Sequence, residues 1–259
     1  MIAFIDVMGF GALVDASIND EISNEIIKRI SDAILSSQES LEEPYASYQF
    51  TQFSDSFVIS RPVKASPVDQ AHFTLAVLNV IDEFLISELL LRGGITQGKL
   101  IHNDKLLFGP AMNRAYELES KVAKVPRIIL DPNLDFASDE FRISIIKRDI
   151  DGLDYIDYFF PRKVFYLVPG WLLQIRNIIN SIPESPRLKD KRNWLISKYN
   201  KAIDDFSYID FENHLKEKAE DRPDIAEDYE KLIFDAKSLD KIKCMSNQPN
   251  SADTKKSCS

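Results

Sequence analysis

Two aspartates stand where apolar runs of this chain break off. Asp6 lies in FIDVMGFG (residues 4–11), and Asp55 lies in FSDSF (residues 53–57). Each is predicted to end a buried strand and to open into a polar site, because burying a charge without a partner is costly. Two converging carboxylates would supply the oxygen ligands that Mg²⁺ or Mn²⁺ prefers when it carries the phosphates of a nucleotide. Taken singly, Asp6 could equally cap a strand, and Asp55 could belong to a hairpin turn.

The glycines point to the same part of the chain. Only eight occur in 259 residues, and six of them fall in three short segments. Glycine is favoured where the backbone approaches a ligand closely or turns sharply, so this clustering predicts one ligand site. The six are Gly9 and Gly11, then Gly93, Gly94 and Gly98, and finally Gly109.

The elements that must position these residues follow from hydrophobic periodicity. It predicts the order β-α-β-β-α-β, followed by further helices and strands. This order is typical of a ferredoxin-like α+β fold, in which helices cover one face of a mostly antiparallel sheet. The end of the first strand then lies beside the central hairpin, so Asp6 and Asp55 are expected to meet. The predicted strands are 1–6, 45–53, 56–62, 91–101, 126–130 and one or two within 155–168, and the predicted helices are 18–35, 67–90 and 110–124.

The character of the chain changes from Trp171 onward. Segments 171–182 and 192–206 are predicted helices, and mixed charged segments follow them. The expected organisation is a catalytic domain at 1–170, a helical extension at 171–245 and a disordered polar tail at 246–259.

Composition limits the function classes. Hydrophobic residues make up 44% and charged residues 28% of the chain, as in ordinary globular proteins. The formal net charge of −9 argues against generic binding to nucleic acid, which needs a basic surface. The apolar stretch 73–91 contains acidic residues, so no membrane span is expected. Cys244 and Cys258 form neither a disulfide framework nor a zinc spacing, and no signal peptide is evident, so a cytoplasmic location is expected.

Four segments together resemble a known family. FIDVMGFG resembles the first metal-binding segment of class III nucleotidyl cyclases, and FSD (53–55) resembles the second, with Ser54 where that family usually has glycine. LRGGITQG (91–98) looks like the family's Arg-x-Gly-Ile strand. GPAMNRA (109–115) looks like the segment that carries the transition-state asparagine, here Asn113. The four occur in the family's order and cover about residues 2–120.

The resemblance implies that the 3′-hydroxyl of a nucleoside triphosphate attacks its own α-phosphorus and releases pyrophosphate. Two Mn²⁺ or Mg²⁺ ions per site would be held by Asp6, Asp55 and the carbonyl of Val7. Asn113 would orient the ribose and would come from the partner subunit, which implies a homodimer with composite sites. The backbone N–H groups that would hold the β- and γ-phosphates belong to Gly9, Phe10 and Gly11.

The departures from the family pattern concern charge. The family's transition-state arginine is replaced by Glu117, so Arg92 and Arg114 are the candidates for that catalytic role, with Arg162 or Lys163 as others. The positions that read adenine in adenylate cyclases hold Thr51 and Leu106.

Because it lacks the charged pair that reads a purine, the chain resembles the Pycsar-type pyrimidine cyclases of bacterial antiphage defence. The resemblance implies UTP or CTP as substrate, with UTP favoured, and a separate effector protein that the cyclic nucleotide activates. Tyr48 and Thr51 are the candidate base-pocket residues, although Tyr48 could equally pack in the core.

Several alternatives stay open. The chain could be a purine cyclase with an unusual base pocket, or an inactive cyclase-like module that binds nucleotides and dimerises. A relative of palm polymerases or diguanylate cyclases is disfavoured by the missing Gly-Gly-Asp-Glu-Phe-like loop. Asn113 could be an ordinary helix-surface residue and Gly93-Gly94 a bulge. The three histidines, His72, His102 and His214, are scattered and receive no chemical role.

Overall fold

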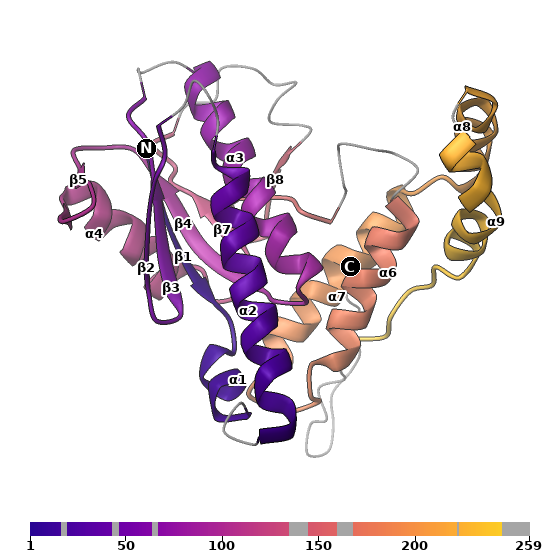
Figure 1. Ribbon diagram of the computed structural model, residues 1–259, viewed down its shortest axis with the longest axis horizontal. Coiled ribbons are helices and arrows are strands. Elements are labelled where there is room, and N and C mark those ends of the chain that lie inside the picture. Colours follow the sequence, from indigo (N-terminus) through magenta and orange to yellow (C-terminus); the bar gives the residue numbers. More distant parts are fainter. Residues whose placement is uncertain are drawn as a thin grey trace. The chain divides into compact units, whose positions relative to one another are not determined.

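The structure is a computed structural model, and it divides into two compact units, Met1–Tyr158 and Phe159–Ser259 (Figure 1). It describes residues 1–16, 20–42, 47–63, 67–134, 145–159, 168–221 and 223–244. In these ranges no helix is both long enough and apolar enough to cross a membrane. The predicted disordered tail at 246–259 lies outside the described residues.

A seven-stranded, mostly antiparallel sheet organises the first unit. Its strand order is β2-β3-β1-β4-β7-β9-β8, and β4 with β7 is a parallel pair. The first four strands in this order reproduce the predicted βαββαβ arrangement, which confirms the α+β fold. A separate short hairpin, β5 with β6, follows β4. The strands are β1 (Ile2–Val7), β2 (Gln49–Phe53), β3 (Ser56–Ser60), β4 (Leu91–Thr96), β5 (Ile101–His102), β6 (Leu107–Phe108), β7 (Ile128–Leu130), β8 (Ile146–Arg148) and β9 (Asp154–Ile156).

Two helices cover one face of this sheet, as predicted for the βαββαβ core. Helices α2 (Asp20–Ser40) and α3 (Pro67–Ile86) pack against each other. Phe84 of α3 stacks on Phe57 of β3, with ring centroids 5.2 Å apart. Most of α3 is apolar because it packs against both the sheet and α2.

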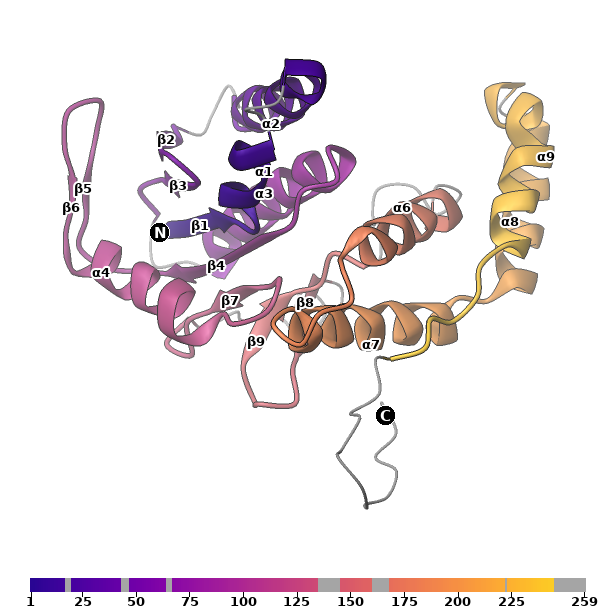
Figure 2. The same ribbon diagram turned by 90° about the horizontal axis from the view of Figure 1, so that it is seen from below.

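A further helix covers the opposite face. Helix α4 (Pro110–Glu117) continues into η1, a π-helix at Leu118–Val122. Ala111 and Ala115 of α4 pack against Ile2, Phe4 and Val58 of the sheet. Figure 2 shows α2 and α3 on one side of β1 and β4, and α4 on the other side.

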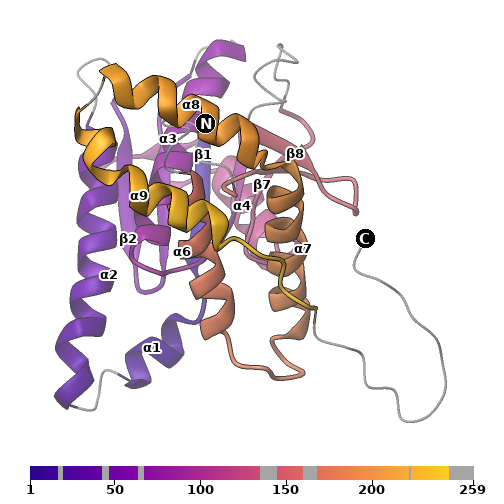
Figure 3. The same ribbon diagram turned by 90° about the vertical axis from the view of Figure 1, so that its right-hand side faces the viewer.

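The second unit is helical. Its helices are α6 (Val168–Ser181), α7 (Lys189–Asp205), α8 (Tyr208–Asp221) and α9 (Pro223–Lys237). Figure 3 shows α8 beside α9, and their contact buries Phe211, Leu215 and Ile233.

The structure differs from the predicted elements in several places, one of which is strand β8, which was not predicted. The helix expected at 110–124 changes from α to π geometry at Leu118. The strand expected at 91–101 ends at Thr96, and only Ile101 at its far end belongs to another strand, β5 of the β5–β6 hairpin. Helix α1 (Phe10–Ala16) was not predicted, since its seven residues are too few to show a periodic pattern.

Candidate active site

Asp6 and Asp55 lie at the same edge of the sheet. Asp6 pairs with Ser56 in the β1–β3 register, which places Asp55 at the adjoining β2–β3 turn. The Val7 N–H donates a hydrogen bond to the Asp55 carbonyl at 2.8 Å. The Ser56 hydroxyl donates to Asp6 Oδ1 at 3.3 Å. The antiparallel ladder therefore brings together two residues that are far apart in sequence.

The turn that presents Asp55 contains a strained residue. Ser54 has a φ of +57°, in the left-handed region that favours glycine. Glycine at this position would adopt the same turn without that strain.

Arg92 and Glu119 complete the cluster at this edge. Arg92 pairs with Asp6 in the β1–β4 register, and its Nε donates to Asp6 Oδ2 at 3.0 Å. The same Nε lies 2.7 Å from Glu119 Oε1, an ion-pair contact that is not aligned as a hydrogen bond. Only 5% of the Glu119 side chain is exposed. Sequence reasoning missed Glu119 because an acid in a predicted helix normally faces solvent.

The electrostatics of the cluster are set by burial and by crowding of like charges. Burial raises the pKa of Asp6, neighbouring Asp55 raises it further, and Arg92 opposes both. Burial likewise raises the pKa of Glu119; Arg92 opposes this, while Asp6 and Asp55 add to it. Asp6 and Glu119 therefore share one guanidinium, and the charge of Asp55 acts on both of them, so the negative charge of the cluster favours an added cation.

Close packing of η1 on the sheet places Glu119 in this cluster. A Cβ added to Gly94 would lie 2.3 Å from Leu118 Cβ and 3.0 Å from the Ala115 carbonyl oxygen. Glycine is therefore required here for the helix to approach β4, which carries Arg92. Gly94 belongs to the regular β4 ladder, where it pairs with Phe4.

The donor set at this edge fits a hard divalent cation. In the described part of the chain, no group of three or more His, Cys, Asp or Glu side chains is arranged to hold a metal ion. Mg²⁺ commonly uses one or two carboxylates, with waters and substrate phosphates as its other ligands. Asp6, Asp55 and the Val7 carbonyl match that limited set.

Gly9 lies between these carboxylates and helix α1. It has a φ of +79° and precedes the first helical residue, Phe10. The chain thus turns from β1 directly into α1, so the N–H groups of Phe10 and Gly11 follow closely after Asp6. Their role as a phosphate cradle stays a prediction.

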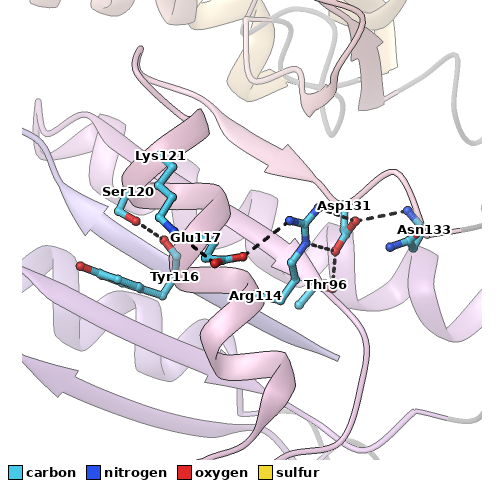
Figure 4. A network of polar contacts seen from close by, with 8 residues as sticks. All are labelled: Thr96, Arg114, Tyr116, Glu117, Ser120, Lys121, Asp131 and Asn133. Atoms are coloured by element: carbon cyan, nitrogen blue, oxygen red, sulfur yellow. Dashed lines mark hydrogen bonds and ion pairs between the residues drawn. The ribbon is translucent and has the colours of Figure 1, made fainter.

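Asn113 and Arg114 lie on α4, away from this cluster. Asn113 is exposed, and its N–H donates to the Gly109 carbonyl at 3.2 Å. Arg114 donates through Nε and Nη2 to the buried carboxylate of Asp131, at 2.8 and 3.2 Å (Figure 4). The Thr96 hydroxyl donates to the same carboxylate at 2.8 Å. This network leaves Arg114 held in place by Asp131 and not directed toward Asp6.

The position of the family's arginine carries a negative charge. Glu117 lies 3.2 Å from Lys121 Nζ and 3.8 Å from Arg114 Nη1 (Figure 4). Among the described candidates, Arg92 lies beside the carboxylates and Arg114 does not, while Arg162 and Lys163 lie outside the described residues.

The two candidate base-pocket residues lie on opposite faces of the sheet. Tyr48 stacks on Phe73 of α3 with ring centroids 6.2 Å apart, and its hydroxyl accepts a hydrogen bond from Arg61 at 3.1 Å. Thr51 lies on the α4 face, where its hydroxyl is 2.8 Å from His102 Nε2. The structure therefore does not bring Tyr48 and Thr51 into one pocket.

Comparisons with known proteins give matches only among solved structures. No family model matches the sequence, and no curated protein matches it. The adenylyl cyclase CyaB from P. aeruginosa is 14% identical, with 62% of this chain and 94% of that chain covered and a TM-score of 0.45. The guanylyl cyclase Cya2 is 12% identical, with 60% and 89% covered and a TM-score of 0.40. The monomeric guanylyl cyclase domain of the RhoGC fusion protein from the aquatic fungus Blastocladiella emersonii is 16% identical, with 60% and 91% covered and a TM-score of 0.39. These likenesses are too distant to carry an argument about activity, which must come from this chain's own residues.

Proposed function

We propose that this chain is a pyrimidine nucleotide cyclase that converts UTP, or CTP, to the 3′,5′-cyclic monophosphate and pyrophosphate. The observation that carries the proposal is the meeting of Asp6 and Asp55 at one sheet edge, joined by the 2.8 Å hydrogen bond from the Val7 N–H to the Asp55 carbonyl. Two carboxylates in a negatively charged surrounding can bind the divalent cations that accompany a nucleoside triphosphate.

The reaction assigns each residue a task. The 3′-oxygen of the substrate forms a bond to the α-phosphorus, the bond from that phosphorus to the pyrophosphate oxygen breaks, and the hydroxyl proton passes to solvent. Bound Mg²⁺ or Mn²⁺ would lower the pKa of the hydroxyl and neutralise charge on the α-phosphate and the leaving group. Asp6, Asp55 and the Val7 carbonyl would hold the ions. Asn113 would orient the ribose from a second copy of the chain.

Arg92 has a further task in this proposal. Its guanidinium lies beside Asp6 and Glu119, where it limits the repulsion among the carboxylates. Because it lies beside Asp6, a proposed metal ligand, it would also stabilise the charge that the α-phosphate gains. Because its Nε already contacts both acids, Arg92 acts from a fixed position.

The preference for a pyrimidine rests on the residues at the purine-reading positions. Thr51 and Leu106 carry no charge, and Leu106 is exposed beside the β5–β6 hairpin. The proposed cellular role is production of a second messenger for a separate effector in bacterial antiphage defence.

Two rival functions are to be distinguished from this one, and a specific observation favours the first. An inactive nucleotide-binding module is favoured by Glu117, which places a carboxylate where the family has its transition-state arginine. The second rival is a purine cyclase. It would have to recognise its base without the charged pair that reads adenine in that family. Retention of both carboxylates argues against the inactive module, since nucleotide binding alone does not need two of them.

One experiment separates these functions. The purified chain is incubated with each of the four ribonucleoside triphosphates and Mn²⁺, and the products are identified by mass spectrometry. A cyclic pyrimidine monophosphate is expected, and its rate should fall at least about a hundredfold in Asp6→Ala and Asp55→Ala. Asp104→Ala, an exposed aspartate in the β5–β6 segment, is the matched control and should keep full activity. A cyclic purine product would establish the purine rival, and binding without any product would establish the inactive module.

A further inference from the structure

Glu119 is a buried acid without an aligned hydrogen bond on one of its oxygens. Its side chain is 5% exposed, and its Oε1 has no aligned donor among the described residues. The charges that act on it come from Arg92, Asp6 and Asp55, so Arg92 is the cation that offsets it. Leaving a buried acceptor without a donor costs free energy, so this position calls for an explanation.

Arg92 offers one N–H to two acids. Its Nε donates to Asp6 Oδ2 at 3.0 Å, while Glu119 Oε1 lies 2.7 Å from the same nitrogen. An arginine Nε carries a single hydrogen, so it can be well aligned with only one of these oxygens at a time. Glu119 therefore has the position of a second acceptor, within reach of the donor that Asp6 holds.

The segment that carries Glu119 is fixed by close contacts. The Ala123 N–H donates to the Leu118 carbonyl at 2.8 Å, the five-residue spacing of the π-helix η1. Single-turn π segments are rare and occur frequently at functional sites. Gly94 has no Cβ and so lets Leu118 lie against β4, which keeps Glu119 beside Arg92.

Asp6 cannot fully serve both Arg92 and a divalent cation. Asp6 and Asp55 are the proposed ligands of the cation, and a carboxylate that binds a cation has less negative charge left for a guanidinium. The cation would also repel Arg92, whose Nε lies 3.0 Å from Asp6 Oδ2. Cation binding therefore weakens the hydrogen bond from Arg92 to Asp6, whereas Glu119 keeps its full charge.

We propose that Glu119 is a positioning residue that receives the Arg92 N–H when Asp6 binds a divalent cation. The exchange frees Asp6 Oδ2 as a ligand and keeps the guanidinium beside the site. Glu119 acts through Arg92 and touches neither the cation nor the substrate. This inference rests on the metal site of the proposed function, and it adds the residue that makes room for the cation.

A double-mutant cycle on Mn²⁺ affinity tests this inference without turnover. The affinity of the full chain for Mn²⁺ alone is measured from the EPR signal of the free ion. Glu119→Gln is expected to weaken binding about tenfold, because a neutral amide competes poorly for the guanidinium and leaves it on Asp6. The same change in the Arg92→Met background should alter the affinity less than about twofold, since no guanidinium remains to be received.

The matched control is an acid in an exposed pair with arginine. Glu88 is 51% exposed and lies 3.2 Å from Arg29, so Glu88→Gln removes the same charge and should leave the Mn²⁺ affinity unchanged. Equal weakening by Glu119→Gln in both backgrounds would show that Glu119 acts on the cation directly. No weakening in the wild-type background would show that Arg92 needs no second acceptor. Either result overturns the inference.

A measurement on the wild type decides the matter even if a variant fails to fold. The ¹⁵N–¹H signal of the Arg92 Nε group is followed during titration with Mg²⁺, which is diamagnetic. The signal is expected to shift and to stay protected from solvent exchange, because Glu119 replaces Asp6 as its acceptor. An unchanged signal with Mg²⁺ bound, or a loss of protection through release of Arg92 to water, overturns the inference.

The outcomes distinguish this inference from the proposed function. Mn²⁺ binding that is lost in Asp6→Ala but does not respond to Glu119→Gln overturns the inference and leaves the proposed function standing. Mn²⁺ binding that Asp6→Ala does not change overturns the metal site of the proposed function, and the inference with it.

Discussion

Arg92 holds together two acids that would otherwise repel each other. We expect Arg92→Met to lower the free energy of unfolding by about 3 kcal/mol, because Glu119 would be left buried beside Asp6 without its cation. Adding Glu119→Gln should recover about half of that loss. Urea denaturation of the two variants measures both effects.

The control for this prediction is an arginine in an exposed pair. Arg148 is 65% exposed and bonds Asp154 at 2.8 Å. Arg148→Met should destabilise the fold far less than Arg92→Met, as is usual for surface pairs. Equal losses of unfolding free energy in the Arg92 and Arg148 variants would show that charge pairing in the buried cluster stabilises the fold no more than a surface pair does.

At the residue scale, sequence patterns identified the acids at strand ends and Arg92, but not Glu119. Asp6 and Asp55 were predictable because each interrupts an apolar run. Glu119 was not, since its burial depends on the close approach of η1 to the sheet. His102 was not predictable either, because its two partners come from β2 and β3, distant in sequence.

Gly94 controls the distance between η1 and the sheet. We expect Gly94→Ala to destabilise the fold by about 1–3 kcal/mol, the usual cost of overpacking, because its Cβ would meet Leu118 and Ala115. Gly170→Ala in α6 is the control, as nothing lies within 4 Å of its added Cβ. That control should be neutral or stabilise by up to about 1 kcal/mol. Thermal unfolding measures the stability of both variants. Equal changes in stability for Gly94→Ala and Gly170→Ala would contradict the prediction.

Asp131 ties three elements together and makes their packing sensitive to pH. Burial raises its pKa, but hydrogen bonds from Arg114, Thr96 and the Asn133 N–H outweigh burial, so its pKa lies below the ordinary value of 3.8. A lowered carboxyl pKa gives stability that is present above about pH 4 and is lost as the pH falls through the folded-state pKa.

We therefore expect the stability difference between the wild type and Asp131→Asn to be largest near neutral pH and to shrink below pH ~4. Urea unfolding at a series of pH values measures this difference. A gap that stays constant or widens as the pH falls would mean that the Asp131 carboxylate does not stabilise the fold through its charge.

The elements were predicted well where they are long and apolar. The βαββαβ order follows from alternating strand and helix patterns, and it placed both aspartates at one edge. The change to π geometry at Leu118 and the short strands β5 and β6 were missed, because two-residue strands and a local change in helix type leave no periodic signal.

At the scale of the whole molecule, one chain does not bring Asn113 to its own carboxylates. Asn113 precedes Glu119 by six residues of helix, roughly 9 Å of rise, and Glu119 marks the carboxylate end. The proposed function uses both ends of this helix, so it requires a second copy of the chain with two-fold symmetry.

Mixing two inactive variants tests this arrangement. Asp55→Ala and Asn113→Ala, combined in equal amounts and allowed to exchange subunits, should regain about a quarter of wild-type activity, since half of the dimers are mixed and each has one intact site. Each variant alone is the baseline. Activity that stays at that baseline after subunit exchange has been verified would rule out composite sites.

The β2–β3 hairpin carries Asp55 at its turn and, through Thr51 and Ser60, the contacts of His102 toward its open end. Side chains alternate between faces along a strand, so a one-residue insertion within either strand would turn the residues beyond it to the opposite face. Over evolutionary time this segment should accept exchanges of side chains while keeping its length constant. Divergent descendants of the chain would then differ in the side chains of this hairpin but not in the number of residues that separates these groups.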